Sequence, residues 1–441
     1  YTAEKIKSKT QGKKFADEVL TLLTLGLLTI VLIVEILTPY VVYLIAPGFI
    51  EDKTKFNLAV DLTRVTFPFL AFVSLSSFFA GILNSENKFA AAAAAPIFLN
   101  LILIFSLVFS YYFKLDYALS LSYGVSLSGL IQLIFLIYFA SKYYQPSLVF
   151  RNKIRQKVKF FLKKLLPSIF SSGVTQISIL IGTIIASFQS GAVSYLYYAD
   201  RIYQINLAIA GIAVSTVSLP ILSKLIKNKK DNQVNKIQNK SLELSLLLSL
   251  PASVALIIGS EVIVNALFGY GSFTESDIEQ TSLALKYFGY GIPAFAVLKI
   301  FANFFFARDN TITPFKVSSV VVFTNIVISI LFFKKIGFII IPIATTVSTW
   351  IGIFYYLYLL LKLSYFKINS QFYTNLIKIV FATSIMSYIF LKGLNYFAKN
   401  LTYSSDYKVL YLLVIVIFVA LLYFLICYFL KVLNLKSFKT N

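Results

Sequence analysis

Residues 195–204 read YLYYADRIYQ and place Asp200 beside Arg201 at the head of an otherwise apolar helix that runs to Pro220. A charged side chain at bilayer depth costs about 2.5 kcal/mol or more on insertion scales, so it persists mainly where it faces a protein interior or a watery cavity. Asp200 and Arg201 are therefore the first candidates for a functional site.

The same apolar character extends over the whole chain of 441 residues, of which 58% are hydrophobic, with a mean hydropathy of +0.81. Apolar runs of about 20 residues recur, which is the length that a helix needs to cross hydrocarbon. We therefore predict an all-α polytopic membrane protein with almost no soluble mass. The twelve predicted spans are residues 18–45, 60–83, 90–113, 117–141, 160–187, 194–221, 241–268, 283–306, 314–334, 337–362, 374–396 and 406–431.

The formal net charge is +22, and the basic residues cluster in connections between the predicted helices. One cluster lies within 142–164 and another within 224–240, whereas the alternate connections at 51–53 and 275–279 are acidic or nearly neutral. This asymmetry follows the positive-inside rule, so the Lys-rich connections and the C-terminus are predicted to be cytoplasmic. Lysines that flank spans need no partner beyond anionic lipid head groups, so we expect no nucleic-acid binding.

Histidine is absent from the sequence, and Cys427 is its single cysteine. This composition excludes imidazole base catalysis, Cys/His metal sites and an intramolecular disulfide. The sequence has no glycine-rich phosphate loop of the P-loop type, which argues against ATP hydrolysis. We expect no metal and no cofactor.

The chain aligns with itself at a shift of 225 residues, where apolar runs, turns and prolines coincide. Internal repeats in polytopic chains usually indicate a transporter whose two halves enclose a site near the membrane midplane. Equivalent points are an even number of helices apart, so the repeat is parallel, with its axis along the membrane normal. The matched pairs are Pro68 with Pro293, Ala71 with Ala296, Phe79 with Phe304, Asn84 with Asp309, and Asn100 with Asn325.

The repeat also predicts the domain organisation. The second copy has two helices over 166–221 for which the first copy has no counterpart, so we predict two further helices before Tyr1 and six helices in each complete lobe. The predicted parts are an N-terminal lobe over 1–145, a basic cytoplasmic linker over 146–165, a C-terminal lobe over 166–362 and a two-helix unit over 363–441.

Five of the forty basic residues are arginines, so the placement of each arginine is informative. A guanidinium offers a planar fork for bidentate contacts to phosphate and cannot lose its charge. Arg201 and Arg308 lie at ends of apolar spans, where the alternative is that they snorkel to the interface. Lys299 lies about two turns inside the span that ends near Arg308, so it lines a cavity or forms a packed ion pair.

Three segments carry a resemblance to a known family. Residues 197–204 (YYADRIYQ) precede Gly211-Ile212-Ala213 and Leu219-Pro220-Ile221-Leu222-Ser223, and the other two segments are 81–100 and 306–316 (FARDNTITPFK). Together they resemble the lipid II flippases, the MurJ/MviN family of the multidrug/oligosaccharidyl-lipid/polysaccharide exporter superfamily. With the order of the connections, the similarity covers essentially the whole chain.

The resemblance implies two six-helix lobes around a cationic central cavity and a C-terminal helix pair that forms a groove for a lipid tail. It implies that lipid II, the undecaprenyl-pyrophosphate-linked disaccharide-pentapeptide, is moved by alternating access across the bacterial cytoplasmic (inner) membrane for peptidoglycan synthesis. It also implies that Asp200 and Arg201 carry functional weight and that Lys299 and Arg308 contribute to substrate binding. Asp200 would position Arg201 or pair with a different cation when the site is empty.

The sequence departs from the family pattern in two places. Several functional arginines of the family lie in its first two helices, whose positions are not part of this sequence. Some members have an acidic or amide residue that helps bind sodium where this chain reads Ile181-Gly182-Thr183, so membrane potential is the better candidate for the driving force. The alternatives are a drug or polyprenyl-oligosaccharide exporter of the same superfamily, a membrane-embedded transferase, or a scaffold for cell-wall enzymes.

Overall fold

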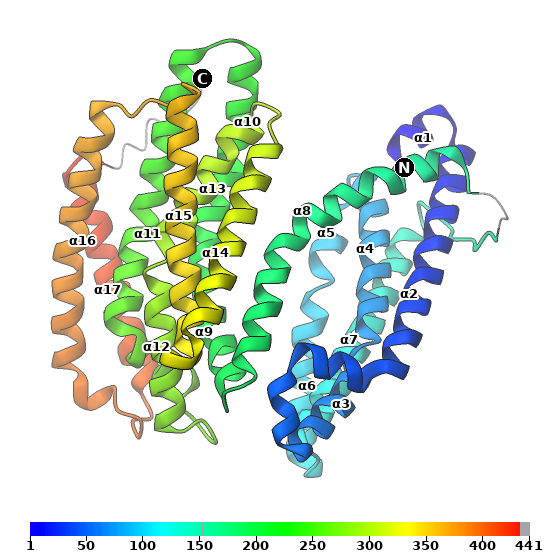
Figure 1. Cartoon of the computed structure of the whole chain (residues 1–441), viewed down its shortest axis with the longest axis horizontal. Helices are drawn as coiled ribbons and strands as arrows, with labels where there is room; N and C mark the ends of the chain where they lie inside the picture. The colour runs from blue at the N-terminus through cyan, green and yellow to red at the C-terminus, as the bar shows by residue number, and fades with distance from the viewer. Residues whose placement is uncertain (151–153, 433–441) are drawn as a thin grey trace. The chain divides into compact units, whose positions relative to one another are not determined.

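The computed structural model describes residues 1–150 and 154–432, apart from the side chains of 164–175 (Figure 1). This part of the chain is almost entirely helical and contains no β-strand, as the apolar runs predicted. It forms two compact units, Tyr1–Ser172 and Gly173–Asn441, and helix α8 (Gln156–Ala186) belongs to both.

Unit 1 is a bundle in which α7 is the central helix. Helices α3, α4 and α6 pack against α7, and α2 packs along α4. The core between them contains Phe79, Leu83, Leu136 and Ala140, each less than a tenth exposed. The helices are α1 (Thr2–Lys7), α2 (Lys9–Ile45), α3 (Lys53–Thr66), α4 (Phe69–Ser85), α5 (Phe89–Ala94), α6 (Ile97–Phe113) and α7 (Tyr117–Ala140).

The segment after α7 is fastened to α2 by buried polar side chains. Asp17 accepts hydrogen bonds from the Tyr144 hydroxyl at 2.7 Å and from the Ser147 N–H at 3.1 Å. One turn along, Thr21 Oγ1 accepts from the Val149 N–H at 2.9 Å. Glu18 accepts from the backbone N–H of Arg155 at 2.7 Å. The start of the basic connection is therefore part of unit 1.

Unit 2 is organised around α11, which contacts α12, α13 and α16 (Figure 1). Helix α17 packs on α16, so the C-terminal pair lies against this central helix. The helices are α9 (Ala192–Leu207), the π-helical turn η2 (Ala208–Ala213), α10 (Val214–Lys227), α11 (Asp231–Phe268), α12 (Glu275–Gly289), α13 (Ile292–Phe306), α14 (Ile312–Ile336), α15 (Ile340–Lys362), α16 (Ser370–Tyr396) and α17 (Lys408–Phe429).

Among the described residues, nine helices are long and apolar enough to cross a membrane, or ten if the bent pair α12 and α13 is one span. That number counts residues 312–362 as one helix. The range contains two helices, α14 and α15, which are separated by a turn at Gly337, whose φ is +73°, and pack side by side. Each of the twelve predicted ranges coincides with a helix or a pair of helices. Helices α2 and α11 begin about ten residues earlier than predicted, because their polar Lys-rich starts continue the helix beyond the apolar part.

Local sequence signals explain where several helices begin. Asp52 caps α3 by accepting from the backbone N–H groups of Thr54 and Lys55, and Asp116 caps α7 in the same way. Helix α12 begins with a reciprocal capping box between Thr274 and Asp277. Such side chains satisfy N–H groups that a helix leaves without partners in its first turn.

The proline pair of the internal repeat marks a break in each unit. Pro68 separates α3 from α4, and Pro293 lies in the first turn of α13, just after the 40° bend from α12. Proline lacks the N–H that a continuous helix needs, so it favours a break at this point.

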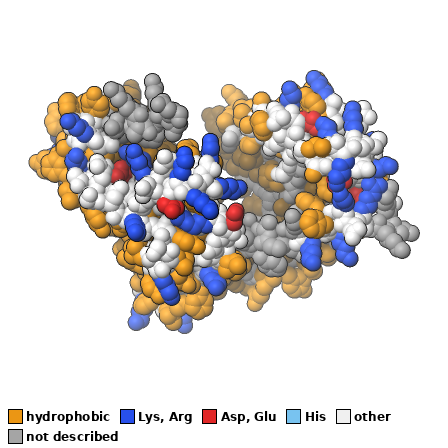
Figure 2. Space-filling model, turned by 90° about the horizontal axis from the view of Figure 1, so that it is seen from above, with side chains coloured by type: hydrophobic (Ala, Val, Ile, Leu, Met, Phe, Trp, Pro, Cys, Tyr) orange, Lys and Arg blue, Asp and Glu red, His pale blue; other side chains and the backbone are white. Residues whose placement is uncertain are grey.

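Figure 2 shows several blue Lys and Arg side chains on the face of unit 2 that it presents, at left. The connection between α10 and α11 in this unit is rich in lysine. Lys224, Lys227, Lys229 and Lys230 are all exposed there. The charged end and the largely apolar sides of this unit agree with a membrane-embedded bundle.

Candidate substrate-binding face of unit 2

Helix α9 presents two chemically different faces. On the packed face, the ring of Tyr203 stacks on Phe288 with centroids 4.9 Å apart, and Tyr198 meets Phe273 edge to face at 5.3 Å. The Tyr195 hydroxyl donates to Asp277 at 2.9 Å, which ties the start of α9 to the start of α12. These tyrosines fix the rotation of α9 and leave its other face exposed.

Arg201 lies on the exposed face of α9. Its guanidinium carbon is 4.6 Å from the centroid of the Tyr197 ring, one turn earlier, which is a cation–π distance. Within the described part of the chain, no carboxylate lies within ion-pair distance of Arg201 and no hydrogen bond occupies its N–H groups. The planar fork is therefore oriented by an aromatic ring and still able to bind an anion.

Asp200 does not pair with Arg201 in this structure. Adjacent residues on a helix point about 100° apart, whereas residues four apart share a face. The carboxylate of Asp200 accepts a hydrogen bond from the side-chain amide of Gln204 instead. The expected role of Asp200, to position Arg201 or to pair with a different cation when the site is empty, stays a prediction.

Lys299 is exposed on α13, and its ammonium lies 5.3 Å from the centroid of Phe295. Phe295 in turn lies against the π-turn, because a β-carbon on Gly211 would be 3.7 Å from its ring. No carboxylate of the described residues forms an ion pair with Lys299, so the packed ion pair considered above is not seen. Lys299 is a second unpaired cation on unit 2.

Arg308 has a different environment. Its Nη1 donates to the carbonyl of Phe304 at 2.6 Å and its Nη2 to the carbonyl of Tyr365 at 3.0 Å, with the Tyr365 ring 4.3 Å away. The guanidinium thus joins the end of α13 to the connection between α15 and α16. Its fork is engaged by backbone carbonyls, which distinguishes it from Arg201.

Ile181, Gly182 and Thr183 occupy the positions where some family members have a sodium-binding residue, and they provide no carboxylate or side-chain amide. Gly182 lies against Ile341, and the Thr183 hydroxyl donates to the carbonyl of Ile179 in its own helix at 3.0 Å. These residues do not fit a cation site, so we derive no step through sodium.

Sequence reasoning missed two members of this face, Tyr197 and Gln204. Both stand four residues from a charged residue, and that spacing could have indicated them. Their role depends on which face of α9 is packed, and the packing tyrosines decide it.

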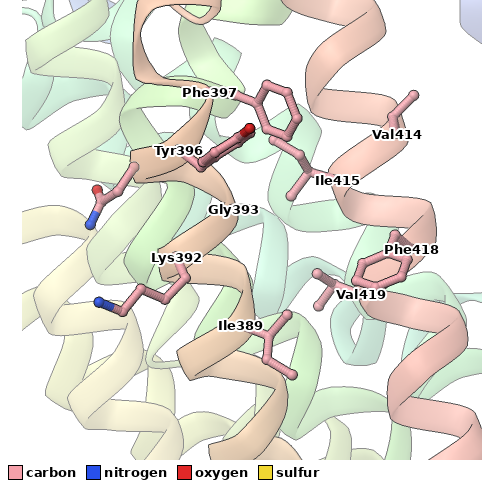
Figure 3. Close-up of a pocket in the computed structure, with 10 residues that line it drawn as sticks. Ile389, Lys392, Gly393, Tyr396, Phe397, Val414, Ile415, Phe418 and Val419 are labelled. Carbon is pink, nitrogen blue, oxygen red and sulfur yellow. The ribbon is translucent and has the colours of Figure 1, made fainter.

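A second feature of unit 2 is a pocket of about 670 Å³ between α16 and α17 (Figure 3). Apolar side chains from both helices form its walls, and Lys392 and Asn395 contribute polar atoms. The lining residues are Ile389, Lys392, Gly393, Asn395, Tyr396, Phe397, Val414, Ile415, Phe418 and Val419.

Solved structures identify the class of fold. The chain superposes on a structure described as "Lipid II flippase MurJ, inward closed conformation" with a TM-score of 0.80 and 24% identity, covering 97% of this chain and 86% of the other. It also superposes on an inward-facing multidrug resistance MATE family transporter of the MOP superfamily, with a TM-score of 0.68 and 13% identity over 81% of this chain and 82% of the other. The chain therefore has the fold that these two structures share.

Sequence comparison gives the family. The family model "Lipid II flippase MurJ" matches residues 1–412. A probable lipid II flippase MurJ of Rickettsia prowazekii (strain Madrid E) is 37% identical over 360 residues, which are 80% of this chain and 70% of the relative. One of Rhizobium meliloti (strain 1021) is 36% identical over 381 residues, 85% of this chain and 71% of the relative. The chain belongs to the lipid II flippase MurJ family and is a multi-pass protein of the bacterial inner membrane.

Proposed function

We propose that this protein is a transporter that moves lipid II from the cytoplasmic to the periplasmic leaflet by alternating access, without covalent chemistry. The observation that carries the proposal is the unpaired guanidinium of Arg201 on an exposed helix face of a MurJ family fold. The pyrophosphate of lipid II joins the polyprenyl group to the sugar and carries two negative charges, and an oriented guanidinium fork is the side chain best suited to it.

In this proposal each candidate residue has a separate task. Arg201 contacts the diphosphate and is held on Tyr197, while Lys299 adds positive charge without a carboxylate that competes for it. Asp200 and Gln204 are joined by a hydrogen bond and lie beside Arg201. Their side chains can contact polar groups of the sugar or peptide. Arg308 acts from a distance by fixing the end of α13, the helix that bears Lys299.

We also propose that the pocket between α16 and α17 takes part of the polyprenyl tail. Its walls are almost entirely carbon, which suits an apolar chain that remains in the membrane region while the head group crosses. Filling it with Val414→Trp should reduce transport, whereas Leu413→Trp, at the preceding and similarly exposed position of α17 that does not line the pocket, serves as the matched control.

The proposed orientation follows from the charge distribution. The lysine-rich connection between α10 and α11, and with it the C-terminus, would face the cytoplasm and the anionic head groups of that leaflet. Reporter fusions at the C-terminus test this orientation independently of transport.

The direct test is rescue of a lipid II flippase depletion strain by the complete reading frame that contains this chain. Wild type should restore growth, and Arg201→Ala should fail at the same membrane abundance. Arg201→Lys keeps the charge but loses the fork, so it should rescue only in part. Lys227→Ala, an exposed cation at the end of α10, is the control and should behave as wild type.

The second candidate function is export of a drug or another polyprenyl-linked oligosaccharide, which the similarity to a MATE family fold keeps open. Failure of stable, inserted wild-type protein to rescue would favour this alternative. Rescue by wild type together with equal rescue by Arg201→Ala would refute the role of Arg201 while leaving the substrate assignment intact.

A further inference from the structure

The span that carries Asp200 and Arg201 is not a continuous α-helix. Residues Ala208–Ala213 form a π-helical turn between α9 and α10. Single π-turns within α-helices accommodate an extra residue and often occur at functional sites. They also leave backbone carbonyls without regular partners, which must then be satisfied from elsewhere.

The spacing of two buried residues on either side of the turn fits one extra residue in the span. Tyr203 and Leu222 are both buried although they are about 19 positions apart, which is about 5.3 turns of a regular α-helix. Such a spacing would rotate the two side chains about 100° away from one another. Removing one residue from the count leaves about five whole turns, so the π-turn restores a common packed side.

Two neighbouring helices donate hydrogen bonds to the backbone, one inside this turn and one just after it in α10. Ser245 of α11, fully buried, donates from Oγ to the carbonyl of Ala210 inside the turn at 3.1 Å. Asn303 of α13, only 4% exposed, donates from Nδ2 to the carbonyl of Ser215 at 2.7 Å. The neighbouring Ser223, by contrast, donates only within its own helix.

A second break lies beside the first. The adjacent span of α12 and α13 is bent by 40° around Gly291, and a β-carbon there would be 3.5 Å from the Tyr203 hydroxyl. Inside the π-turn, a β-carbon on Gly211 would lie 3.3 Å from the Cα of Ala296 in α13. The span of α9 and α10 and the span of α12 and α13 are therefore both discontinuous where they lie against each other. Helix α9 packs on α12, and α10 packs on α13.

We propose that η2 is a joint within the substrate-binding helix, and that Ser245 and Asn303 are positioning residues that hold it while α9 changes direction relative to α10. The inference rests on the proposed transport function, because it assigns the joint to the movement of Asp200 and Arg201. Each half of the span is anchored to a different helix, so bending at η2 moves the charged end without unwinding either half.

Deletion of Ile209 tests the joint directly. Ile209 is exposed, and its removal should convert η2 to regular α-helix while both flanking halves keep their packed faces. The variant should reach the membrane at wild-type abundance and lose rescue of the depletion strain. Deletion of Val217, an exposed residue within regular α10, is the control: it should rotate the two halves apart and reduce abundance.

Hydrogen exchange gives a readout that does not depend on lipid II. Amides of 208–213 should exchange faster than those of the flanking turns in the wild type, and deletion of Ile209 should slow them to the flanking rate. Ser245→Ala and Asn303→Leu each remove a donor, so exchange in this segment should become faster than in the wild type. Ser245→Thr keeps the hydroxyl and should exchange at the wild-type rate. Ser223→Ala, whose hydroxyl bonds only within its own helix, should also leave the rate unchanged.

The outcomes separate this inference from the proposed function. Rescue by the Ile209 deletion at wild-type level would refute the joint, and failure of that variant to accumulate would refute the register argument. Unchanged exchange in Ser245→Ala and Asn303→Leu would refute their positioning role. If the wild type itself fails to rescue, the proposed function fails, while the exchange pattern still supports or refutes the joint.

Discussion

The most demanding prediction concerns Lys408, the first residue of α17, which is only 1% exposed. Its ammonium donates to the carbonyl of Gly269 at 2.6 Å, to the carbonyl of Tyr403 at 2.8 Å and to Oδ1 of Asn265 at 3.3 Å. The ring of Tyr270 lies 4.1 Å away. An ammonium has three donors, so all of them are used without any carboxylate partner.

The geometry sets the expected magnitude for Lys408→Met. A hydrogen bond to a charged group contributes about 1.5–3 kcal/mol, but the three bonds are not additive and the buried ammonium itself is costly to desolvate. Asn265 and Gly269 lie at the C-terminal end of α11, where the helix dipole adds a favourable term of about 0.3–1 kcal/mol. We therefore expect the docking of α16 and α17 to weaken by about 3 kcal/mol.

Hydrogen exchange of the purified protein in a lipid nanodisc measures this loss locally. A loss of about 3 kcal/mol corresponds to exchange about 100-fold faster in peptides from 397–412. Lys399→Met, an exposed lysine in the same connection, is the control and should leave exchange unchanged. An exchange rate in Lys408→Met equal to that of the wild type would show that the three hydrogen bonds of the ammonium contribute no net stability, and it would refute the reasoning.

Three further predictions concern other contacts. Arg308→Lys keeps the charge but cannot reach both Phe304 and Tyr365, so the melting temperature in detergent should fall by about 2 °C, and an unchanged value would contradict the role of the fork. Tyr144→Phe should free the segment after α7 at a cost of about 1 kcal/mol, seen as faster proteolysis of the connection. Burial and the hydrogen bond to Asp17 raise the pKa of Tyr144 above its ordinary value near 10. The stability that the neutral hydroxyl contributes is therefore complete below about pH 10 and is lost as the pH rises further. Above about pH 10 the wild type should lose more stability than Tyr144→Phe. Gly211→Val should destabilise the contact with Ala296 by about 1–3 kcal/mol, whereas Gly81→Val, where a β-carbon meets nothing within 4 Å, should cost far less.

Local sequence was sufficient for the membrane class, the helical ranges, the repeat and the placement of Asp200 and Arg201 on an apolar span. These properties depend on sums over neighbouring residues, such as the hydropathy of about 20 residues or the charge of a connection. The prolines at the two breaks were also visible, because proline acts on its own backbone. Helical periodicity separates the tyrosines of 195–203 into two faces, but only the packing against α12 shows which face is exposed.

The tertiary structure decided which charged and polar side chains have partners. Arg308 is engaged by Tyr365, Lys408 by Gly269 and Tyr403, and Ser245 by the π-turn of another helix. These contacts join residues that are distant in the chain, and apolar helices of similar composition carry no local signal for which of them will meet. The π-turn itself has no local sequence signature either, because it depends on side chains of other helices, such as Ser245, that donate hydrogen bonds to its backbone carbonyls.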